Sequence, residues 1–310
     1  MIHIYLPIAE VSVNLLLLLA IGGGVGFLSG LFGVGGGFLL TPLLIFVGIP
    51  PAIAVGSEAN QLVAASLSGV IAHWRGGRVD LRMGIMLLVG GLIGSTLGVS
   101  IFAWLRDSGQ IDIVIKLLYV VLLGAIGAMM MVESVRANLK NLRNKESAEA
   151  DEKTGAATWR QRLPWQMHFP TSNVTISPLL PIGLGVIVGI LAAVMGIGGG
   201  FIMVPAMIYL LGMPTAIVVG TSLFQILFVA SNVTLQQAMR VQTVDVVLAL
   251  LLMIGSVLGA QIGVRAGARL KGEELRFLLA FIVLAVCGWM VFNLTSKPDF
   301  LFTLVTAGGH

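Results

Sequence analysis

The sequence holds few charged residues and a single cysteine. Of 310 residues only 10% are charged and 57% are hydrophobic, whereas a soluble domain usually carries about 25% charged residues. So few charges cannot cover a water-facing surface, which excludes a soluble enzyme and predicts an exterior that faces lipid. The lone Cys287 excludes an internal disulfide. His3, His168 and His310 are isolated, without metal-ligand spacing, so we expect no metal and no cofactor.

The net charge of +4 is distributed like that of a membrane protein. Basic residues stand in short connections between apolar runs, as in cytoplasmic loops, so we expect a lipid bilayer and no nucleic acid as partner. Glu10 is the only Asp, Glu, Lys or Arg before the first apolar run, which continues into a glycine-rich motif. This start predicts no cleavable signal peptide.

Eight apolar runs approach or exceed the roughly 20 residues that cross a bilayer. They cover residues 12–32, 52–73, 83–105 and 112–135, and again 177–195, 216–237, 246–266 and 274–295. A shorter apolar stretch follows the first run of each set, at 34–48 and at 197–212. At about 1.5 Å per residue these stretches reach about 22–24 Å, short of a hydrocarbon core of about 30 Å. We therefore expect short tilted helices or re-entrant segments there.

The chain contains one module twice. Residues 26–61 align with residues 189–225 with one gap. Identical pairs include Gly33/Gly196, Gly35–Gly37/Gly198–Gly200, Pro42/Pro205, Gly56/Gly220, Gln61/Gln225 and, further on, Gly90, Gly94 and Gly98 with Gly255, Gly259 and Gly263. We predict a first transmembrane repeat over 1–135 and a second over 177–310. The charged segment 136–176 between them is predicted to be a solvated cytoplasmic linker.

The distribution of arginine and lysine favours an inverted second repeat. If loop 74–82 and the linker are cytoplasmic, five crossings per repeat also bring the basic cluster at 265–276 inside, whereas four crossings export it. The expected fold is an all-α polytopic membrane protein with both termini outside. Each repeat would have four long transmembrane helices plus one short or broken helix, giving eight to ten helices in total.

Two glycine motifs, GVGGGF and GIGGGF, are the sharpest local signals. Their glycines are Gly33, Gly35, Gly36 and Gly37 in the first repeat and Gly196, Gly198, Gly199 and Gly200 in the second. Glycine permits a break in the helix, and irregular backbone at membrane depth is tolerated where it lines a cavity. The helix restarting after each motif would point its N–H groups at that cavity, a geometry that binds anions. The alternative is close helix packing by small residues. The motifs lack the Lys-Ser/Thr of a nucleotide loop.

A polar cluster follows each motif inside an apolar run. It comprises Ser57, Asn60 and Gln61 in the first repeat and Thr221, Ser222 and Gln225 in the second. Hydroxyl and amide groups at membrane depth usually face a bundle interior or a water-filled path, where they could donate hydrogen bonds to an oxyanion. Hydrogen bonding between helices is the alternative. Further polar residues recur along the same helices and could extend a path: Ser66, Ser68, Ser231, Asn232, Gln236 and Gln237.

Glu58 lies within the first cluster, and its repeat partner is Ser222. Burial disfavours the charged form of a carboxyl group, which makes Glu58 the candidate for proton coupling. Alternatively, Glu58 stands at a helix start near the membrane surface, where its charge meets the helix dipole. Asp80 and Asp245 follow loops and are expected to cap the next helices. The glycine ladders at 90–98 and 255–263 are expected to be packing faces.

These motifs resemble the sulfite exporter TauE/SafE family of membrane permeases. The resemblance rests on the duplicated Gly-Val/Ile-Gly-Gly-Gly-Phe, the proline four residues later, Gly-Thr-Ser-x-x-Gln in the second half, the charged loop before Val79-Asp80 and the glycine ladders. It implies transport of sulfite, organosulfonates or related anions across a prokaryotic inner membrane. The substrate region would comprise the segments from Gly33 and Gly196 and those ending at Gln61 and Gln225. Ser-Glu in the first repeat, where the second has Thr-Ser, departs from site symmetry.

The leading hypothesis is a secondary transporter for a small sulfur-containing anion, working by alternating access. The second is an anion channel that uses the same donors. An intramembrane enzyme is disfavoured, because no Ser-His-Asp set, paired metal ligands or cysteine nucleophile stands out. A structural or sensory membrane protein has only the linker in its favour. A homo-oligomer is compatible with each of these hypotheses.

Overall fold

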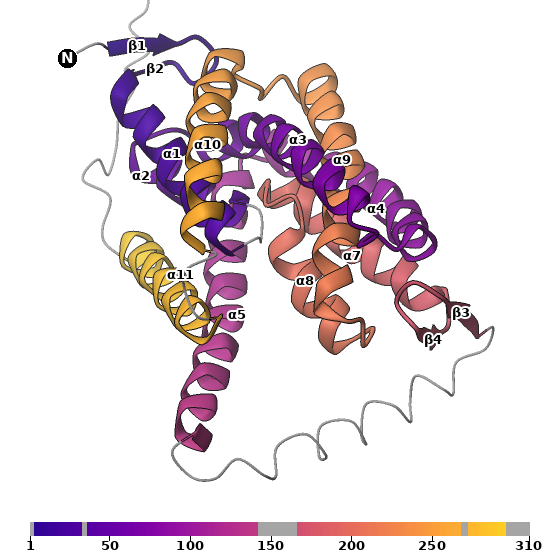
Figure 1. Ribbon diagram of the computed structural model, residues 1–310. Coiled ribbons are helices and arrows are strands. Elements are labelled where there is room, and N and C mark those ends of the chain that lie inside the picture. Colours follow the sequence, from indigo (N-terminus) through magenta and orange to yellow (C-terminus); the bar gives the residue numbers. More distant parts are fainter. Residues whose placement is uncertain (1–2, 33–35, 142–165, 268–271, 296–310) are drawn as a thin grey trace, which may run out of the picture.

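The computed structural model describes residues 3–32, 36–141, 166–267 and 272–295 (Figure 1). The first half contains β1 (His3–Leu6), β2 (Val11–Asn14), α1 (Leu15–Phe32), α2 (Gly37–Phe46), α3 (Pro51–Arg75), α4 (Leu81–Asp107) and α5 (Ile111–Asn141). The second contains β3 (Met167–Phe169), β4 (Val174–Ile176), α7 (Leu179–Met195), α8 (Gly200–Tyr209), α9 (Thr215–Gln236), the π-helix η1 (Gln237–Val241), α10 (Val246–Gly267) and α11 (Gly272–Thr295). Both halves thus follow one order of elements: hairpin, helix, ten-residue helix and three longer helices.

The helices have the length and composition of a polytopic membrane protein. Within the described residues, α4, α5, α9, α10 and α11 are each long and apolar enough to cross a bilayer. They coincide with five of the eight predicted runs. Helices α1 and α7 are apolar but shorter, with 18 and 17 residues. Helix α3 has 25 residues, but polar side chains such as Glu58 and Gln61 interrupt its apolar sequence.

Two features of the chain outline were not expected from the sequence. The strands form two antiparallel hairpins, β1–β2 and β3–β4, so the fold is not purely α-helical. Within the predicted linker 136–176, helix α5 continues to Asn141, and β3 and β4 lie between 167 and 176. Residues 142–165 of that linker lie outside the described residues. The role of the linker stays a prediction.

Helices α2 and α8 are short, as the sequence predicted. Each has ten residues, which at about 1.5 Å per residue span about 15 Å, half of the hydrocarbon core. Helix α7 ends at Met195, and the chain turns through Gly196, Gly198 and Gly199 with φ of 76°, 68° and 80° before α8 begins. These left-handed angles favour glycine. The second motif therefore breaks the helix; Gly33 and Gly35 of the first motif lie outside the described residues.

The two halves interlock through reciprocal helix pairs (Figure 1). Helix α1 packs along α10, α7 along α4, α5 along α11, and α3 along α9. A Cβ atom on Gly90 or Gly94 would collide with the backbone of α7, and one on Gly259 or Gly263 with the backbone of α1. The glycine ladders are therefore packing faces, as predicted, and allow the α1–α10 and α4–α7 backbones to approach closely.

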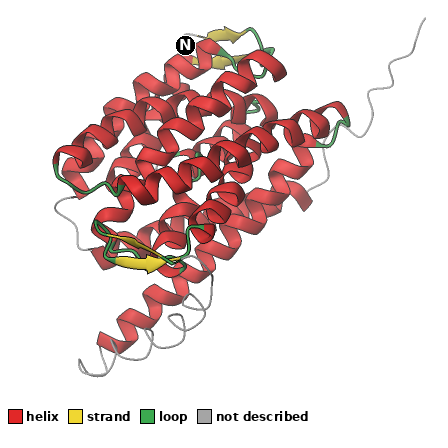
Figure 2. Ribbon diagram, turned by 90° about the vertical axis from the view of Figure 1, so that its right-hand side faces the viewer, coloured by secondary structure: helices red, strands yellow, loops and turns green. Residues whose placement is uncertain are grey.

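Helices α3 and α9 run antiparallel through the middle of this arrangement. Gly56, near the start of α3, faces Thr243 beyond the end of α9; a Cβ there would lie 2.8 Å from the Thr243 carbonyl oxygen. Gly220, near the start of α9, faces Arg78 beyond the end of α3. A Cβ on Gly220 would lie 3.1 Å from the carbonyl carbon of Arg78. Figure 2 shows the two hairpins at opposite ends of the helical body.

Asp80 caps α4 and joins the halves. Its Oδ1 accepts a hydrogen bond from the Met83 N–H at 3.1 Å, the predicted capping contact. Its own N–H donates to the Thr221 hydroxyl of α9 at 3.0 Å. Its Oδ2 accepts from the N–H of Ser172, in the turn between β3 and β4, at 3.1 Å. Through its carboxyl group and its backbone N–H, the buried Asp80 thus fastens a helix start to two segments of the other half.

Asp245 repeats this pattern at the start of α10. Its Oδ1 accepts from the Leu248 N–H at 3.1 Å, which confirms the second predicted cap. Its N–H donates to the Ser57 hydroxyl of α3 at 2.9 Å, and its Oδ2 accepts from the N–H of Ile8, in the turn between β1 and β2, at 3.0 Å. Each aspartate therefore anchors the hairpin of the opposite half.

Asp245→Ala is expected to destabilise the fold by about 2–4 kcal/mol. It removes the helix cap at the Leu248 N–H, worth about 1 kcal/mol, and leaves the Ile8 N–H without its acceptor, at about 1–3 kcal/mol. The free energy of unfolding in detergent measures the effect. Asp112→Ala, at an exposed position in the first turn of α5, is the control and should cost less than about 0.5 kcal/mol. Equal stability of the two variants would contradict this role of Asp245.

Candidate functional site

A cavity of about 480 Å³ lies among α1, α3, α8, α9 and α10. Its polar lining consists of Ser29, Ser66, His73, Ser256, Gln261 and Arg265. Ile197 and Gly200, from the turn into α8, line it as well. A water molecule occupies about 30 Å³ of liquid, so the space accommodates a small solute together with water. The cavity thus reaches the second glycine motif, where the helix is broken.

The charge of the cavity wall suits an anion. Arg265 is exposed near the end of α10, and His73 stands near the end of α3, so the two mark one end of the cavity. The other polar lining groups are hydroxyls and the Gln261 amide, and none of the described lining residues is acidic. A guanidinium group is always charged in proteins, and a wall of one sign raises the local concentration of the opposite ion.

The α7–α8 turn is held against α3 of the other half. A Cβ on Gly198 would lie 2.6 Å from Cδ1 of Leu62, and one on Gly196 would lie 3.1 Å from Cα of Val55. A side chain at Gly196 would press on the backbone of α3, and one at Gly198 would force the Leu62 side chain to move. The glycines are therefore required twice, for the backbone angles and for the close approach of the turn.

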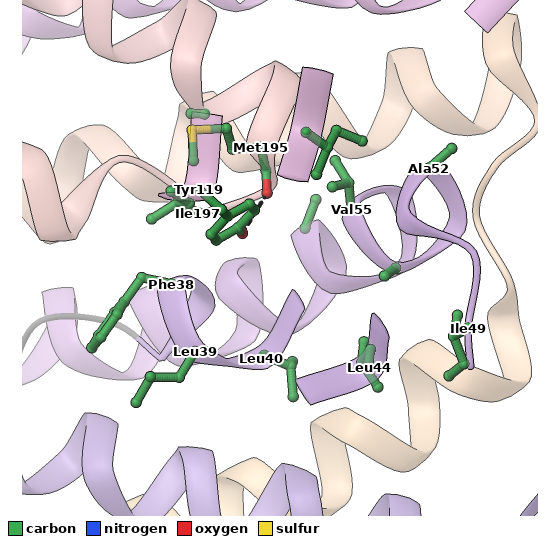
Figure 3. Packing of buried hydrophobic residues seen from close by; sticks show 14 of the residues in the cluster. Phe38, Leu39, Leu40, Leu44, Ile49, Ala52, Val55, Tyr119, Met195 and Ile197 are labelled. Carbon is green, nitrogen blue, oxygen red and sulfur yellow. Dashed lines mark hydrogen bonds between the residues drawn. The ribbon is translucent and has the colours of Figure 1, made fainter. Parts of the chain in front are cut away.

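The two glycine motifs meet at the boundary between the halves. Phe38 and Phe201, which end the motifs, stack with ring centroids 4.2 Å apart. A Cβ on Gly37 would lie 2.9 Å from the carbonyl oxygen of Ile197. Figure 3 shows the surrounding apolar cluster, in which Tyr119 of α5 donates a hydrogen bond to the Met195 carbonyl at 2.7 Å. The described end of the first motif and the turn of the second motif are thus neighbours in space.

Glu58 is buried beside this junction. It is fully buried at the eighth position of α3, so the alternative that placed it at a helix start near the surface is wrong. Its Oε2 accepts a hydrogen bond from the Thr41 hydroxyl of α2. Its Oε1 lies 2.7 Å from the position of a Cβ on Gly37 and has no hydrogen-bond partner. Tyr119 lies near enough to interact electrostatically with the carboxyl group.

The predicted hydroxyl donors also take part in hydrogen bonds within the fold. Ser57 and Thr221 accept the N–H groups of Asp245 and Asp80, and the Ser222 hydroxyl donates to the Val219 carbonyl within α9 at 3.0 Å. For Ser57 and Thr221 the structure shows the alternative considered above, hydrogen bonding between segments of the two halves.

The predicted amides, in contrast, are buried and incompletely bonded. Among the residues that the structure describes, neither amide atom of Gln225 has a hydrogen-bond partner, and neither the Gln61 oxygen nor the Asn60 nitrogen has one. Gln225 is fully buried and Gln61 is 3% exposed. A buried polar atom without a partner costs about 1–3 kcal/mol, so such groups are retained where a ligand, ion or water satisfies them.

Several residues around the cavity were not singled out as site residues from the sequence. Ser29 and Gln261 lie in helices whose glycines dominate the local pattern. Arg265 was considered only as one of the basic residues that indicate the membrane topology. Thr41 and Tyr119, beside Glu58, come from α2 and α5. No local motif marks these positions. A comparison of the repeats could have drawn attention to Thr41, which accompanies Glu58 in the first half only.

The sulfite exporter TauE/SafE model matches residues 18–290. The chain belongs to the TauE/SafE family. Among similar proteins, the probable membrane transporter protein YjnA of Bacillus subtilis strain 168 is 31% identical over 88% of this chain and 97% of its own length. A probable membrane transporter protein of Xylella fastidiosa strain 9a5c is 30% identical over 90% of this chain and 96% of its own. No solved structure gives a significant match.

Family membership and the helices together assign the class of the protein. It is a multi-pass membrane protein and a membrane transporter of the TauE/SafE family, not an enzyme. The resemblance identified from the glycine motifs is thereby confirmed over nearly the whole chain.

Proposed function

We propose that the protein is a secondary transporter that moves a small sulfur-containing anion, such as sulfite, a sulfonate or an organosulfonate, across a prokaryotic inner membrane. The observation that carries this proposal is the cavity that ends at the broken α7–α8 turn and carries no acidic group among its described lining residues. The start of a helix favours negative charge, and a discontinuous helix near the boundary of two repeats is a common substrate site in transporters.

The two repeats would provide the two halves of this site. The first contributes α3 with the amide of Gln61; the second contributes α8 and the amide of Gln225. The antiparallel course of α3 and α9 and the reciprocal pairs α1–α10 and α7–α4 support repeats of inverted topology. With the predicted cytoplasmic location of loop 74–82, the end of the cavity at His73 and Arg265 would face the cytoplasm.

Two helix–helix interfaces, here called the α3–α10 seam and the α4–α9 seam, support alternating access. On one seam, Ala260 and Gln261 of α10 line the cavity beside α3. Their repeat equivalents in α4, Ser95 and Thr96, instead bond to α9: Asn232 donates to the Ser95 hydroxyl at 2.8 Å and to Thr96 at 3.3 Å. Gln236 also donates to the Thr96 hydroxyl, at 3.1 Å. In inverted repeats these seams serve opposite membrane faces, so one open and one closed seam correspond to a state open to one side.

Gln225→Ala and Gln61→Ala are each expected to weaken substrate binding about tenfold or more while leaving the fold at least as stable. One hydrogen bond to a charged ligand contributes about 1.5–3 kcal/mol, and removing an unpartnered buried amide relieves its desolvation cost. Sulfite binding and thermal unfolding in detergent measure the two effects. Unchanged sulfite binding would show that the two amides do not contact the substrate. A large loss of stability would show that their role is structural.

Glu58→Gln is expected to abolish the pH dependence of transport. A bound anion favours the protonated carboxyl, so by linkage anion binding to the wild type should tighten as the pH falls, by up to about tenfold per unit for one linked proton. Glutamine imitates the neutral form at every pH. Methanesulfonate flux over a pH series is the suitable measurement, because this substrate keeps its charge. An unchanged pH profile in the variant would show that Glu58 couples no proton.

Transport into proteoliposomes tests the function itself. Purified protein should accelerate the movement of labelled sulfite or a sulfonate far above the rate in protein-free vesicles, with saturation at high substrate. If no member of this class of anion moves under any imposed gradient, the proposal is wrong.

A further inference from the structure

The starts of α2 and α8 differ in what faces them. At α2, Oε1 of Glu58 lies 2.7 Å from the position of a Cβ on Gly37, the first residue of the helix. The Thr41 hydroxyl, one turn further, donates to Oε2. Glu58 is fully buried, and Oε1 has no hydrogen-bond partner. A carboxyl group of the chain itself therefore lies beside the first residue of α2, near the positive end of the helix dipole.

The second half lacks both members of this pair. The repeat equivalents are Ser222 for Glu58 and Val204 for Thr41. Helix α8 packs on α9 as α2 packs on α3, but the Ser222 hydroxyl donates to the Val219 carbonyl of its own helix at 3.0 Å. The start of α8 thus receives neither a carboxylate nor a hydroxyl from the equivalent positions.

The cavity reaches the helix start that lacks the carboxyl group. Gly200, the first residue of α8, lines it together with Ile197. Ser66, only 2% exposed, is also among the lining residues, and Arg265 provides positive charge at the far end. Gly37 and Glu58 are not among the lining residues.

We propose that each chain binds one transported anion, at the start of α8, and that Glu58 is a built-in carboxylate filling the equivalent place at α2. The inference rests on the proposed function and makes its site asymmetric. A Cβ atom on Gly37 would lie 2.7 Å from Oε1 of Glu58 and 2.9 Å from the carbonyl oxygen of Ile197. The resident carboxyl therefore lies beside the turn that leads into α8, where its charge state acts on the substrate anion.

Ser222→Glu tests this assignment by giving the second half the acid that the first half has. Ser222→Gln has the same size without the charge and measures the steric cost alone. Sulfite binding by isothermal titration, with protein in lipid nanodiscs, should be at least tenfold weaker in the Glu variant than in the Gln variant. Equal affinities of the two variants would overturn the proposal.

The number of sulfite ions bound by the wild type provides the second readout, which holds even if Ser222→Glu fails to fold. One ion per chain supports the inference; two ions per chain would show that both helix starts accept substrate and would overturn it. A different result would refute the proposed function. If the wild-type protein neither binds nor transports sulfite or a sulfonate, that function is wrong, whatever the variants do.

Discussion

Replacing Gly199 with valine is expected to abolish transport. Gly199 precedes α8 with φ of +80°, and a Cβ there would collide with Val188 of α7. A non-glycine residue in this region costs about 1–3 kcal/mol, and more when it is β-branched. The turn would leave its left-handed geometry, and the start of α8 would move away from the cavity. A loss of about 3 kcal/mol corresponds to about a hundredfold weaker binding. Initial rates of labelled sulfite uptake into proteoliposomes measure it.

Gly183→Val provides the matched control for this experiment. Gly183 lies in the same helix that ends at the turn, and a Cβ there would meet no atom within 4 Å. Both variants gain the same side chain, but only Gly199→Val forces the backbone to change. Uptake near the wild-type rate is expected for Gly183→Val. Full activity of a correctly folded Gly199→Val protein would contradict the idea that the broken turn forms the anion site.

A disulfide across the α4–α9 seam is expected to stop transport completely and reversibly. The Ser95 hydroxyl and the Asn232 amide nitrogen are 2.8 Å apart, so cysteines at these two positions would face each other across the seam, where an oxidant or a short bifunctional thiol reagent can join them. Alternating access requires this seam to open when the α3–α10 seam closes. Locking it with the oxidised pair should hold the cavity open to one side and reduce sulfite uptake to the level of protein-free vesicles.

The design includes its own controls because Cys287 is the sole cysteine of the chain. In a Cys287→Ser background, each single cysteine variant should transport with or without oxidant, and reductant should restore the double variant. Undiminished flux through the oxidised double variant would argue against alternating access and in favour of the anion channel. Single-channel currents, or their absence, would then decide between the two mechanisms.

Local sequence predicted those parts of the fold that local chemistry determines. The breaks follow from glycines that alone adopt the angles at Gly196, Gly198 and Gly199. The caps at Asp80 and Asp245 follow from a short acidic side chain before an apolar run. The duplication made the equivalence of the two halves visible before any contact was known. The distribution of arginine and lysine predicted that the repeats are inverted, which remains part of the proposal.

Features that depend on contacts between distant segments were not predictable. Ser57 and Thr221 were singled out as anion donors, and nothing in the local sequence indicated that each also accepts a hydrogen bond from a helix start of the opposite half, 188 and 141 residues away. The β-hairpins are only three or four residues per strand, too short to stand out beside apolar helices. Gln261 and Arg265 enter the cavity through the packing of α10, which no local pattern reveals.

Counterflow in proteoliposomes tests most directly whether this cavity carries an anion by alternating access. Vesicles are loaded with unlabelled sulfite and diluted into a trace of labelled sulfite, with the membrane potential held at zero. The structure and the family predict transient, saturable accumulation of label above equilibrium, which Gly199→Val abolishes. Label that only equilibrates, or that enters protein-free vesicles equally fast, would contradict the account.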